Sequence, residues 1–286
     1  MHITALIVVF YISCCIRVGA APWRYFQANA RYFSREKGIF SKMSIDQLIP
    51  EKWRLSQSMD SDSIIPSEYP VFLKPEWGQN GSGIVRADNF EQLQALRKEH
   101  NSDNRRFMIQ EAATGAREFE IFGIRSGLQG ERHDLVTVTE SINGSHRYPI
   151  NSIKNKLTVY RDVTSEFTED QLGVLSGFIQ EIGTFRITRV SARADSIEQL
   201  LAGDFKIIEI NLFIPMPINI MDPDYTWADR LRFLGKSMKL LAITTKLQPS
   251  PPRPPAIFTR MCLYGRIRAA QERIVRRPVG ERRTHP

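Results

Sequence analysis

The run from Tyr69 to Arg86 (YPVFLKPEWGQNGSGIVR) limits the fold of this chain more than any other segment. In it, an apolar strand ends in Lys74 and opens into a loop with three glycines, Gly78, Gly81 and Gly83. Backbone N–H groups of such a loop can converge on an anion, and the lysine adds a point charge beside them. The order differs from the phosphate loop in which lysine follows the glycines, and from the dinucleotide fingerprint G-x-G-x-x-G. The run therefore predicts a phosphate-binding loop that points to ATP, with a hairpin turn and a surface lysine as the alternative.

The positive charge of the chain is concentrated at its C-terminal end. Nine arginines and two glutamates lie between Arg253 and Pro286, so this tail carries most of the net charge of +8. A basic tail says little about the fold, and we expect no specific nucleic-acid partner. The three cysteines (Cys14, Cys15 and Cys262) have the spacing of neither a disulfide framework nor a metal site. A reducing, cytoplasmic compartment fits this cysteine usage best.

The N-terminal segment is apolar and has two interpretations. Residues 3–16 carry no charged side chain, and the first arginine is Arg17. A secretory signal would have its positive charge before the apolar run. Positive charge after the run would instead keep the rest of the chain cytoplasmic if the segment enters a membrane. Since a full span takes ~20 residues, the alternatives are an anchor or interfacial helix at the inner membrane face, and a buried helix or strand.

Hydrophobic periodicity predicts strands and helices that alternate along the chain. The predicted strands are 71–74, 106–111, 118–125, 135–141, 184–194 and 205–211. The predicted helices are 44–50, 89–99, 168–183 and 227–245, the third of them capped by Thr168. Non-local strand pairing favours an α+β fold over a doubly wound parallel sheet.

The expected domain organisation has three parts. Residues 1–21 form the apolar segment, and residues 22–248 form one compact body with a small lobe at about 60–112. The proline-rich run at 249–255 then begins a Pro/Arg-rich tail, 249–286, which we expect to be flexible.

Four segments that carry polar side chains occur in a distinctive order. They are Lys42 before a short helix, Lys74 before the glycine loop, Gln110-Glu111 at a strand end followed by Glu118, and Glu209-Ile-Asn211 at another strand end with Arg189 on the strand before it. Over roughly residues 40–245, this order and spacing resemble the ATP-grasp superfamily, in particular domains of the D-alanine–D-alanine ligase type. The resemblance implies two α+β lobes that sandwich the nucleotide.

The resemblance also implies roles for these residues toward ATP. Lys42 and Lys74 would hold the phosphates, Glu111 would lie beside the adenine, and Glu118 would accept hydrogen bonds from the ribose hydroxyls. A flexible lid over the phosphates would consist of Gly78, Gln79, Asn80, Gly81, Ser82 and Gly83. Taken singly, each residue also has a plainer interpretation, such as a surface lysine or a solvated carboxylate.

The last segment predicts a magnesium site, and the resemblance implies a reaction. Glu209 and Asn211 present two hard oxygen ligands on one strand face, which suits Mg²⁺. Arg189 would stabilise the acyl phosphate or the oxyanion formed when a carboxylate attacks the γ-phosphate. The resemblance implies an ATP-dependent ligase that joins a small-molecule carboxylate to an amine.

One position departs from the family pattern. Where these ligases usually carry Arg-x-Asp, with the aspartate as a further metal ligand, this chain has Arg189-Val-Ser191. Asp195 follows in Arg193-Ala-Asp195 on the same strand face, but about 13 Å farther along. If Ser191 is the true equivalent, one metal site is weakened. The alternative function is then a non-catalytic or degenerate ATP-binding protein, associated with a membrane in one version of this hypothesis.

The residues ahead of Lys42 are a second departure. Most ATP-grasp ligases have a sizeable N-terminal domain there, whereas 41 residues precede Lys42 in this sequence. We therefore expect the acceptor pocket to be completed by a partner, a second copy or a membrane surface.

Overall fold

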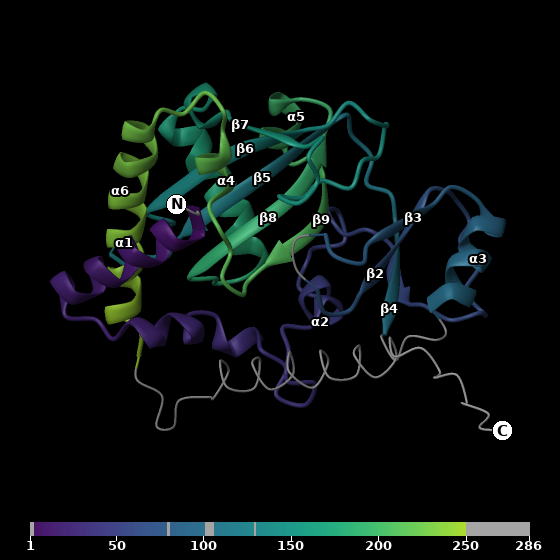
Figure 1. Cartoon of the computed structure of the whole chain (residues 1–286), viewed down its shortest axis with the longest axis horizontal. Helices are drawn as coiled ribbons and strands as arrows, with labels where there is room; N and C mark the ends of the chain where they lie inside the picture. The colour runs from purple at the N-terminus through teal and green to yellow at the C-terminus, as the bar shows by residue number, and fades with distance from the viewer. Residues whose placement is uncertain (1–2, 79–80, 101–105, 129, 250–286) are drawn as a thin grey trace, which may run out of the picture.

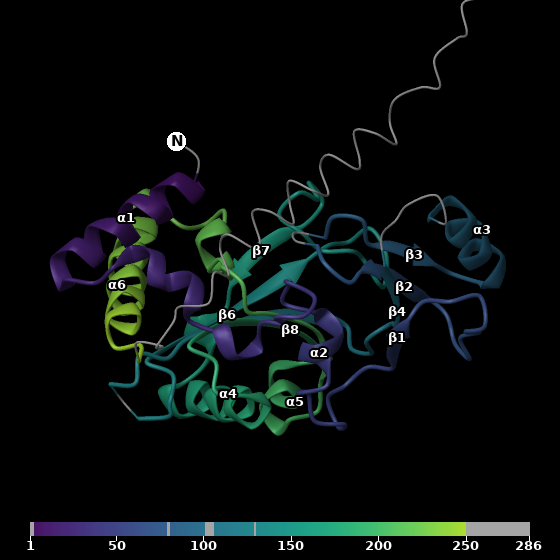
Figure 2. The ribbon, with the colours of Figure 1, turned by 90° about the horizontal axis from the view of Figure 1, so that it is seen from below.

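Two antiparallel sheets lie side by side and carry the helices on their faces (Figures 1 and 2). The computed structural model describes residues 3–78, 81–100, 106–128 and 130–249. Every strand pair that it records is antiparallel. The α+β class predicted from the sequence is confirmed.

The smaller sheet has four strands in the order β1-β4-β2-β3. Its elements are β1 (Gln57–Met59), β2 (Val71–Pro75), β3 (Val85–Ala87), β4 (Phe107–Glu111) and the helix α3 (Phe90–His100). Leu73 and Leu93 are fully buried in its own apolar core. A buried ion pair between Arg97 and Asp60, 2.6 Å apart, fixes α3 to the segment after β1.

The larger sheet has five strands in the order β7-β6-β5-β8-β9. Its strands are β5 (Arg117–Ile124), β6 (Leu135–Ile142), β7 (Val159–Asp162), β8 (Ile187–Ala194) and β9 (Lys206–Asn211). The helices α4 (Glu169–Ile182) and α5 (Ile197–Ala202) cover one face, and α1 (Ile3–Val18) and α6 (Trp227–Lys246) lie together at one end of the other face (Figure 2). The short helices are α2 (Lys42–Asp46), η1 (Pro22–Gln27), η2 (Ala30–Tyr32), η3 (Thr164–Glu166) and η4 (Ile218–Met221).

Local signals explain why the long helices begin and end where they do. Thr168 and Gln171 form a reciprocal capping box at the start of α4. Leu175 and Ile179 lie one turn apart on its buried face. In the connection between β8 and β9, the helix α5 ends at Gly203, whose φ of 81° favours glycine.

The short helix predicted at 44–50 is present, but its bounds are Lys42–Asp46. The helix in this region, α2, begins at Lys42, because Ser41 rather than Ser44 is its cap and accepts a hydrogen bond from the Ser44 backbone N–H. Three short strands, β1, β3 and β7, were not predicted. Each has three or four residues and is too short to show a clear alternation.

The apolar N-terminal segment forms the helix α1, which packs against α6. Cys15 is fully buried between them, and the hydroxyl groups of Tyr11 and Thr245 lie 2.9 Å apart. The opposite side of α1 exposes Val9 and Ile16. Of the two interpretations of this segment, the structure shows the packed helix. Across the described residues, no helix has the length and apolar character needed to cross a bilayer. The predicted tail from residue 250 onward, with Cys262, lies outside the described residues.

Candidate functional site

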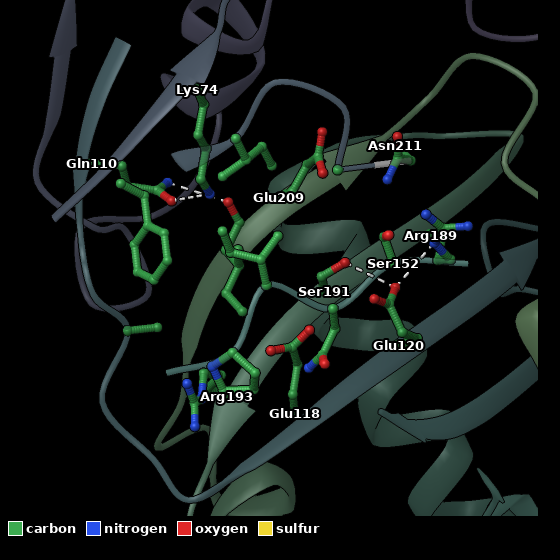
Figure 3. Close-up of a pocket in the computed structure, with 18 of the residues that line it drawn as sticks. Lys74, Gln110, Glu118, Glu120, Ser152, Arg189, Ser191, Arg193, Glu209 and Asn211 are labelled. Atoms are coloured by element: carbon green, nitrogen blue, oxygen red, sulfur yellow. Dashed lines mark hydrogen bonds and ion pairs between the residues drawn. The ribbon is translucent and has the colours of Figure 1, made fainter. Parts of the chain in front are cut away.

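A pocket between the two sheets gathers most of the polar residues predicted from the sequence (Figure 3). The smaller sheet contributes Phe72, Lys74, Gln110 and Glu111 to its lining. The larger sheet contributes Glu118, Glu120, Tyr160, Arg189, Ser191, Arg193, Ile208, Glu209 and Asn211. The segment between β6 and β7 adds Ile150, Asn151 and Ser152.

Lys74 lies on β2 and is 5% exposed, so it is a buried lysine rather than a surface one. Its Nζ donates a hydrogen bond to the Oε1 atom of Gln110 on β4. Burial lowers the pKa of Lys74 to about 8, although the nearby carboxylate of Glu209 acts in the opposite direction. At neutral pH the side chain is therefore still mostly charged, but it is poorly solvated.

Lys42 lines a neighbouring pocket together with Lys74 and Glu209. It is the first residue of α2, and its Nζ lies 3.0 Å from Oε1 of Glu209. Burial raises the pKa of Glu209, but Lys42 and Lys74 outweigh it, so the pKa lies below its usual value. The two lysines thus hold Glu209 ionised, with an unfavourable Coulombic interaction between themselves.

The site is built on three adjacent strands, β5, β8 and β9. Glu120 pairs with Ser191 across β5 and β8, and Ser191 pairs with Glu209 across β8 and β9. Arg189 pairs with Asn211 in the next row. Directly opposed residues of an antiparallel pair share a face, so all five side chains point into the pocket (Figure 3).

An irregularity in β9 adds one more side chain to the pocket wall. The pairing register between β8 and β9 shifts after Ser191, which leaves Ile208 as the extra residue of a bulge. As a result, the consecutive residues Ile208 and Glu209 both line the pocket. The carbonyl of Ile208 also accepts a hydrogen bond from Gln110 at 3.2 Å, which connects the two sheets.

Two carboxylates of β5 are buried close to each other. Burial, with a smaller contribution from the neighbouring Glu120, raises the pKa of Glu118 to about 7, while a hydrogen bond with Asn151 and the charge of Arg193 oppose the shift. Burial also raises the pKa of Glu120, against the effect of Arg189. The Nε atom of Arg189 lies 3.0 Å from Oε2 of Glu120.

Oxygen donors at this site suit Mg²⁺. Glu209, Asn211 and Glu120 all offer hard oxygen atoms, and Mg²⁺ usually takes only one or two carboxylates from the protein. In the described part of the chain, no three or more His, Cys, Asp or Glu side chains gather closely enough to hold a metal by themselves. A magnesium ion at this place would therefore be completed by phosphate oxygens and water.

The glycine loop joins β2 to β3, which pair as a hairpin. Gly81 lines the pocket with a φ of 66°, and a Cβ atom there would lie 3.0 Å from the Cβ of Ser152. Glycine therefore permits the close approach of this loop to the segment between β6 and β7. Gly78, Ser82 and Gly83 are described but do not line the pocket. The predicted positions Gln79 and Asn80 lie outside the described residues.

Two other predicted residues lie away from the row of strands. Glu111 lines the pocket, where its Oε1 accepts a hydrogen bond from the backbone N–H of Ser56 at 2.7 Å. Asp195 is exposed beyond the end of β8, and its Oδ1 accepts a hydrogen bond from the N–H of Ala116 at 2.9 Å. The structure does not bring Asp195 to Glu209.

Glu120 and Arg193 were not anticipated as site residues. Arg193 is 6% exposed, its Nη2 donates to the carbonyl of Arg147 at 3.0 Å, and its Nε has no hydrogen-bond partner in the described chain. Period-two alternation would have found both, because Glu120 follows Glu118 by two residues and Arg193 follows Ser191 by two.

Comparison with known proteins finds distant similarities to solved structures. No family model and no curated protein matches the chain. Among solved structures, it is similar to the L-amino acid ligase from Bacillus licheniformis, with 16% identity and a TM-score of 0.46 over 73% of this chain and 48% of that one. It is also similar to the VanG D-Ala:D-Ser ligase from Enterococcus faecalis, with 14% identity and a TM-score of 0.48 over 72% of this chain and 60% of that one. A third is the ATP-grasp ligase PsnB complexed with minimal precursor, with 12% identity and a TM-score of 0.43 over 77% and 63% of the two chains.

This chain shares 12–16% of its residues with these three ligase structures. It spans about half to just under two thirds of the length of these solved chains. At such identities and TM-scores the similarity supplies no substrate and no activity for this chain. Those must come from the side chains of the pocket.

Proposed function

We propose that this chain is a Mg²⁺-dependent ligase that uses ATP to activate a carboxylate for attack by an amine. The observation that carries the proposal is the pocket between the sheets, in which the buried Lys74 faces Glu209, Asn211 and Arg189. Lys42 lies at the edge of this group through its ion pair with Glu209. The two sheets would act as two lobes, the smaller at about 60–112, with ATP between them.

The pocket has suitable groups for each part of ATP. Cationic side chains stabilise phosphate charge, and this role falls to Lys74, Lys42 and Arg189. Glu118 offers a carboxyl group to the ribose hydroxyls. Apolar side chains that line the pocket and would contact the base are Leu55, Phe72, Ala113 and Ile208. The buried Nε of Arg193, which has no hydrogen-bond partner in the described residues, also fits a pocket that receives a polar ligand.

The proposed reaction has two steps. In the first, a carboxylate oxygen of the substrate attacks the γ-phosphorus, and the bond from that phosphorus to the bridging oxygen breaks, so that ADP leaves. In the second, the amine nitrogen attacks the carbonyl carbon of the acyl phosphate, loses a proton, and phosphate leaves. Arg189 would stabilise the negative charge that develops on the transferred group. Bound Mg²⁺ would neutralise charge on the phosphate oxygens.

Entry of the nucleotide requires movement. The pocket encloses about 90 Å³ of free space, whereas ligand pockets usually measure about 300–1,000 Å³. We therefore expect the smaller sheet to move away from the larger one when ATP enters. The hydrogen bond from Gln110 to the Ile208 carbonyl is one of the contacts that would have to open.

Calorimetry with Mg²⁺-ATP tests the nucleotide site. Wild type should bind with a Kd in the micromolar range, typical for an ATP-using enzyme, and Lys74→Ala should abolish binding. Lys52→Ala is the matched control, because that lysine is 55% exposed and pairs with Glu181 outside the pocket. If folded wild type does not bind ATP, or if Lys74→Ala binds as wild type does, the proposal is wrong.

A nucleotide-binding protein without turnover is the second candidate, favoured by Ser191 at the position where a metal-ligating aspartate is expected. The two candidates differ in ADP release. A ligase should release ADP in a manner that depends on both a carboxylate and an amine, and Glu209→Ala should abolish this release. Tight ATP binding without ADP release across a broad set of carboxylates and amines would favour the second candidate.

A further inference from the structure

We propose that Glu120 on β5 replaces the carboxylate missing at Ser191 on β8, and that Glu120 holds Mg²⁺ together with Glu209 and Asn211. This inference rests on the proposed function, and it concerns the position at which the chain departs from the family pattern. The metal ligand would then come from β5 instead of the neighbouring strand β8.

The register of the sheet is the first step of the argument. Glu120, Ser191 and Glu209 form one continuous row across β5, β8 and β9, with Ser191 in the middle. Neighbouring strands lie about 4.8 Å apart, so both glutamates stand one strand away from Ser191. A glutamate has one more methylene group than an aspartate, and this extra length lets it lean over the position of the smaller serine.

The contacts of Glu120 are the second step. The hydroxyl of Ser191 donates to Oε2 of Glu120 at 2.8 Å. Arg189 also approaches Oε2, at 3.0 Å, as an ion pair without the alignment of a hydrogen bond. Both contacts thus fall on the same oxygen (Figure 3). Among the described residues, no donor is recorded at Oε1, which is left for a cation.

Glu209 also has one oxygen beside a protein cation. Its Oε1 receives the ion pair from Lys42, and Lys42 and Lys74 lower its pKa. The two glutamates therefore flank Ser191, each with one oxygen assigned to a protein cation. Asn211 adds an amide oxygen from the same strand as Glu209. This donor set, two carboxylates and an amide with phosphate and water, is suitable for Mg²⁺.

The plainer alternative is that Glu120 only neutralises Arg189. That function would be satisfied by any carboxylate beside the arginine and would not require the hydroxyl of Ser191. The chain offers a direct comparison in the same sheet, where Glu140 on β6 uses both oxygens to accept from Arg117, at 2.7 and 2.8 Å. Both oxygens of Glu140 are thus occupied by its partner, whereas the two contacts of Glu120 share Oε2.

A carboxylate swap tests this inference on the full chain. Mn²⁺ is used in place of Mg²⁺, and its affinity is measured by electron paramagnetic resonance in the presence of a non-hydrolysable ATP analogue. Glu120→Gln should weaken Mn²⁺ binding about 100-fold, because loss of even an outer-shell partner costs 10–100-fold. Adding Ser191→Asp to Glu120→Gln should restore the affinity to within a few-fold of wild type. The matched control Glu140→Gln should bind Mn²⁺ as wild type does.

Three outcomes decide the question. If Glu120→Gln keeps wild-type Mn²⁺ affinity, or if Ser191→Asp gives no rescue, Glu120 is not the replacement ligand, and the proposed function stands apart from that result. If wild type binds the ATP analogue neither with nor without Mn²⁺, the proposed function fails and this inference fails with it. If Glu120→Gln does not fold, the single variant Ser191→Asp is tested instead. The added carboxylate should then change the Mn²⁺ affinity or the electron paramagnetic resonance spectrum of bound Mn²⁺. If both are unchanged, the proposal is wrong.

Discussion

Replacement of Lys74 by methionine should stabilise the unliganded protein while it abolishes ATP binding. The pKa of this buried lysine is about 8 in the folded chain, compared with 10.5 for an unperturbed lysine. The folded state therefore holds its proton less tightly than the unfolded state does. Below pH 8 the charged side chain lowers the free energy of unfolding, and this cost disappears as the pH rises from 8 to 10.5.

The size of the effect follows from the pKa shift. A difference of 2.5 between the two pKa values corresponds to about 3 kcal/mol at pH 7. Lys74→Met removes this cost but leaves the buried amide oxygen of Gln110 without its donor, at about 1 kcal/mol. The net gain is about 2 kcal/mol. For a chain of this size, it should raise Tm by roughly 4–8 °C.

Chemical denaturation at pH 7 and pH 10 measures the prediction directly. At pH 7 the variant should be the more stable protein, and by pH 10 most of the difference should be gone, because the wild-type lysine is then neutral when folded. Lys52→Met at an exposed lysine is the control, and its stability should follow wild type at both pH values. A Lys74→Met protein that is less stable at pH 7, or a difference that does not shrink with pH, would refute the reasoning.

Three further substitutions test the packing of the fold away from the site. Gly123→Ala should cost about 1–3 kcal/mol in urea unfolding, since its Cβ would lie 2.8 Å from Cδ2 of the buried His133, and His133→Ala in the same chain should recover most of it. Leu234→Ala should lower the free energy of unfolding by about 3 kcal/mol, because this fully buried side chain of α6 belongs to the core shared with α1. Arg97→Met should cost about 3 kcal/mol by leaving Asp60 largely buried without its partner, and the further change Asp60→Asn should restore much of it.

The elements that the sequence predicted well have strong local signals. The helix α4 combines a threonine cap, acidic residues in its first turn and apolar residues at helical spacing. Five of the six predicted strands lie within a residue or two of β2, β4, β5, β6 and β9, and the sixth, predicted at 184–194, begins at Ile187 as β8. The start of α2 was misplaced because both Ser41 and Ser44 are suitable caps. Only tertiary packing chooses between them.

Features that depend on strand pairing could not be predicted from the sequence. The bulge that turns both Ile208 and Glu209 into the pocket has no sequence signal, because the segment Lys206–Asn211 reads as an ordinary apolar strand. The burial of Lys74 likewise depends on β4, since Gln110 is 36 residues away along the chain and becomes its hydrogen-bond partner only through the pairing of β2 and β4.

The same dependence on strand register explains why the sequence motif Arg-x-Asp does not identify the residues of the metal site in this chain. Arg193-Ala-Asp195 has the expected letters, yet Asp195 lies beyond the end of β8, tied to Ala116. Arg189-Val-Ser191 lacks the expected letter, yet Ser191 lies between two glutamates of neighbouring strands. In a sheet, directly paired residues on neighbouring strands lie close together on the same face. A carboxylate on one strand can therefore supply the metal ligand that is missing from the paired position on the next strand. A motif search along a single strand would report such a replacement as a lost ligand. The Mn²⁺ affinities of Glu120→Gln, with and without Ser191→Asp, distinguish a lost ligand from a replaced one.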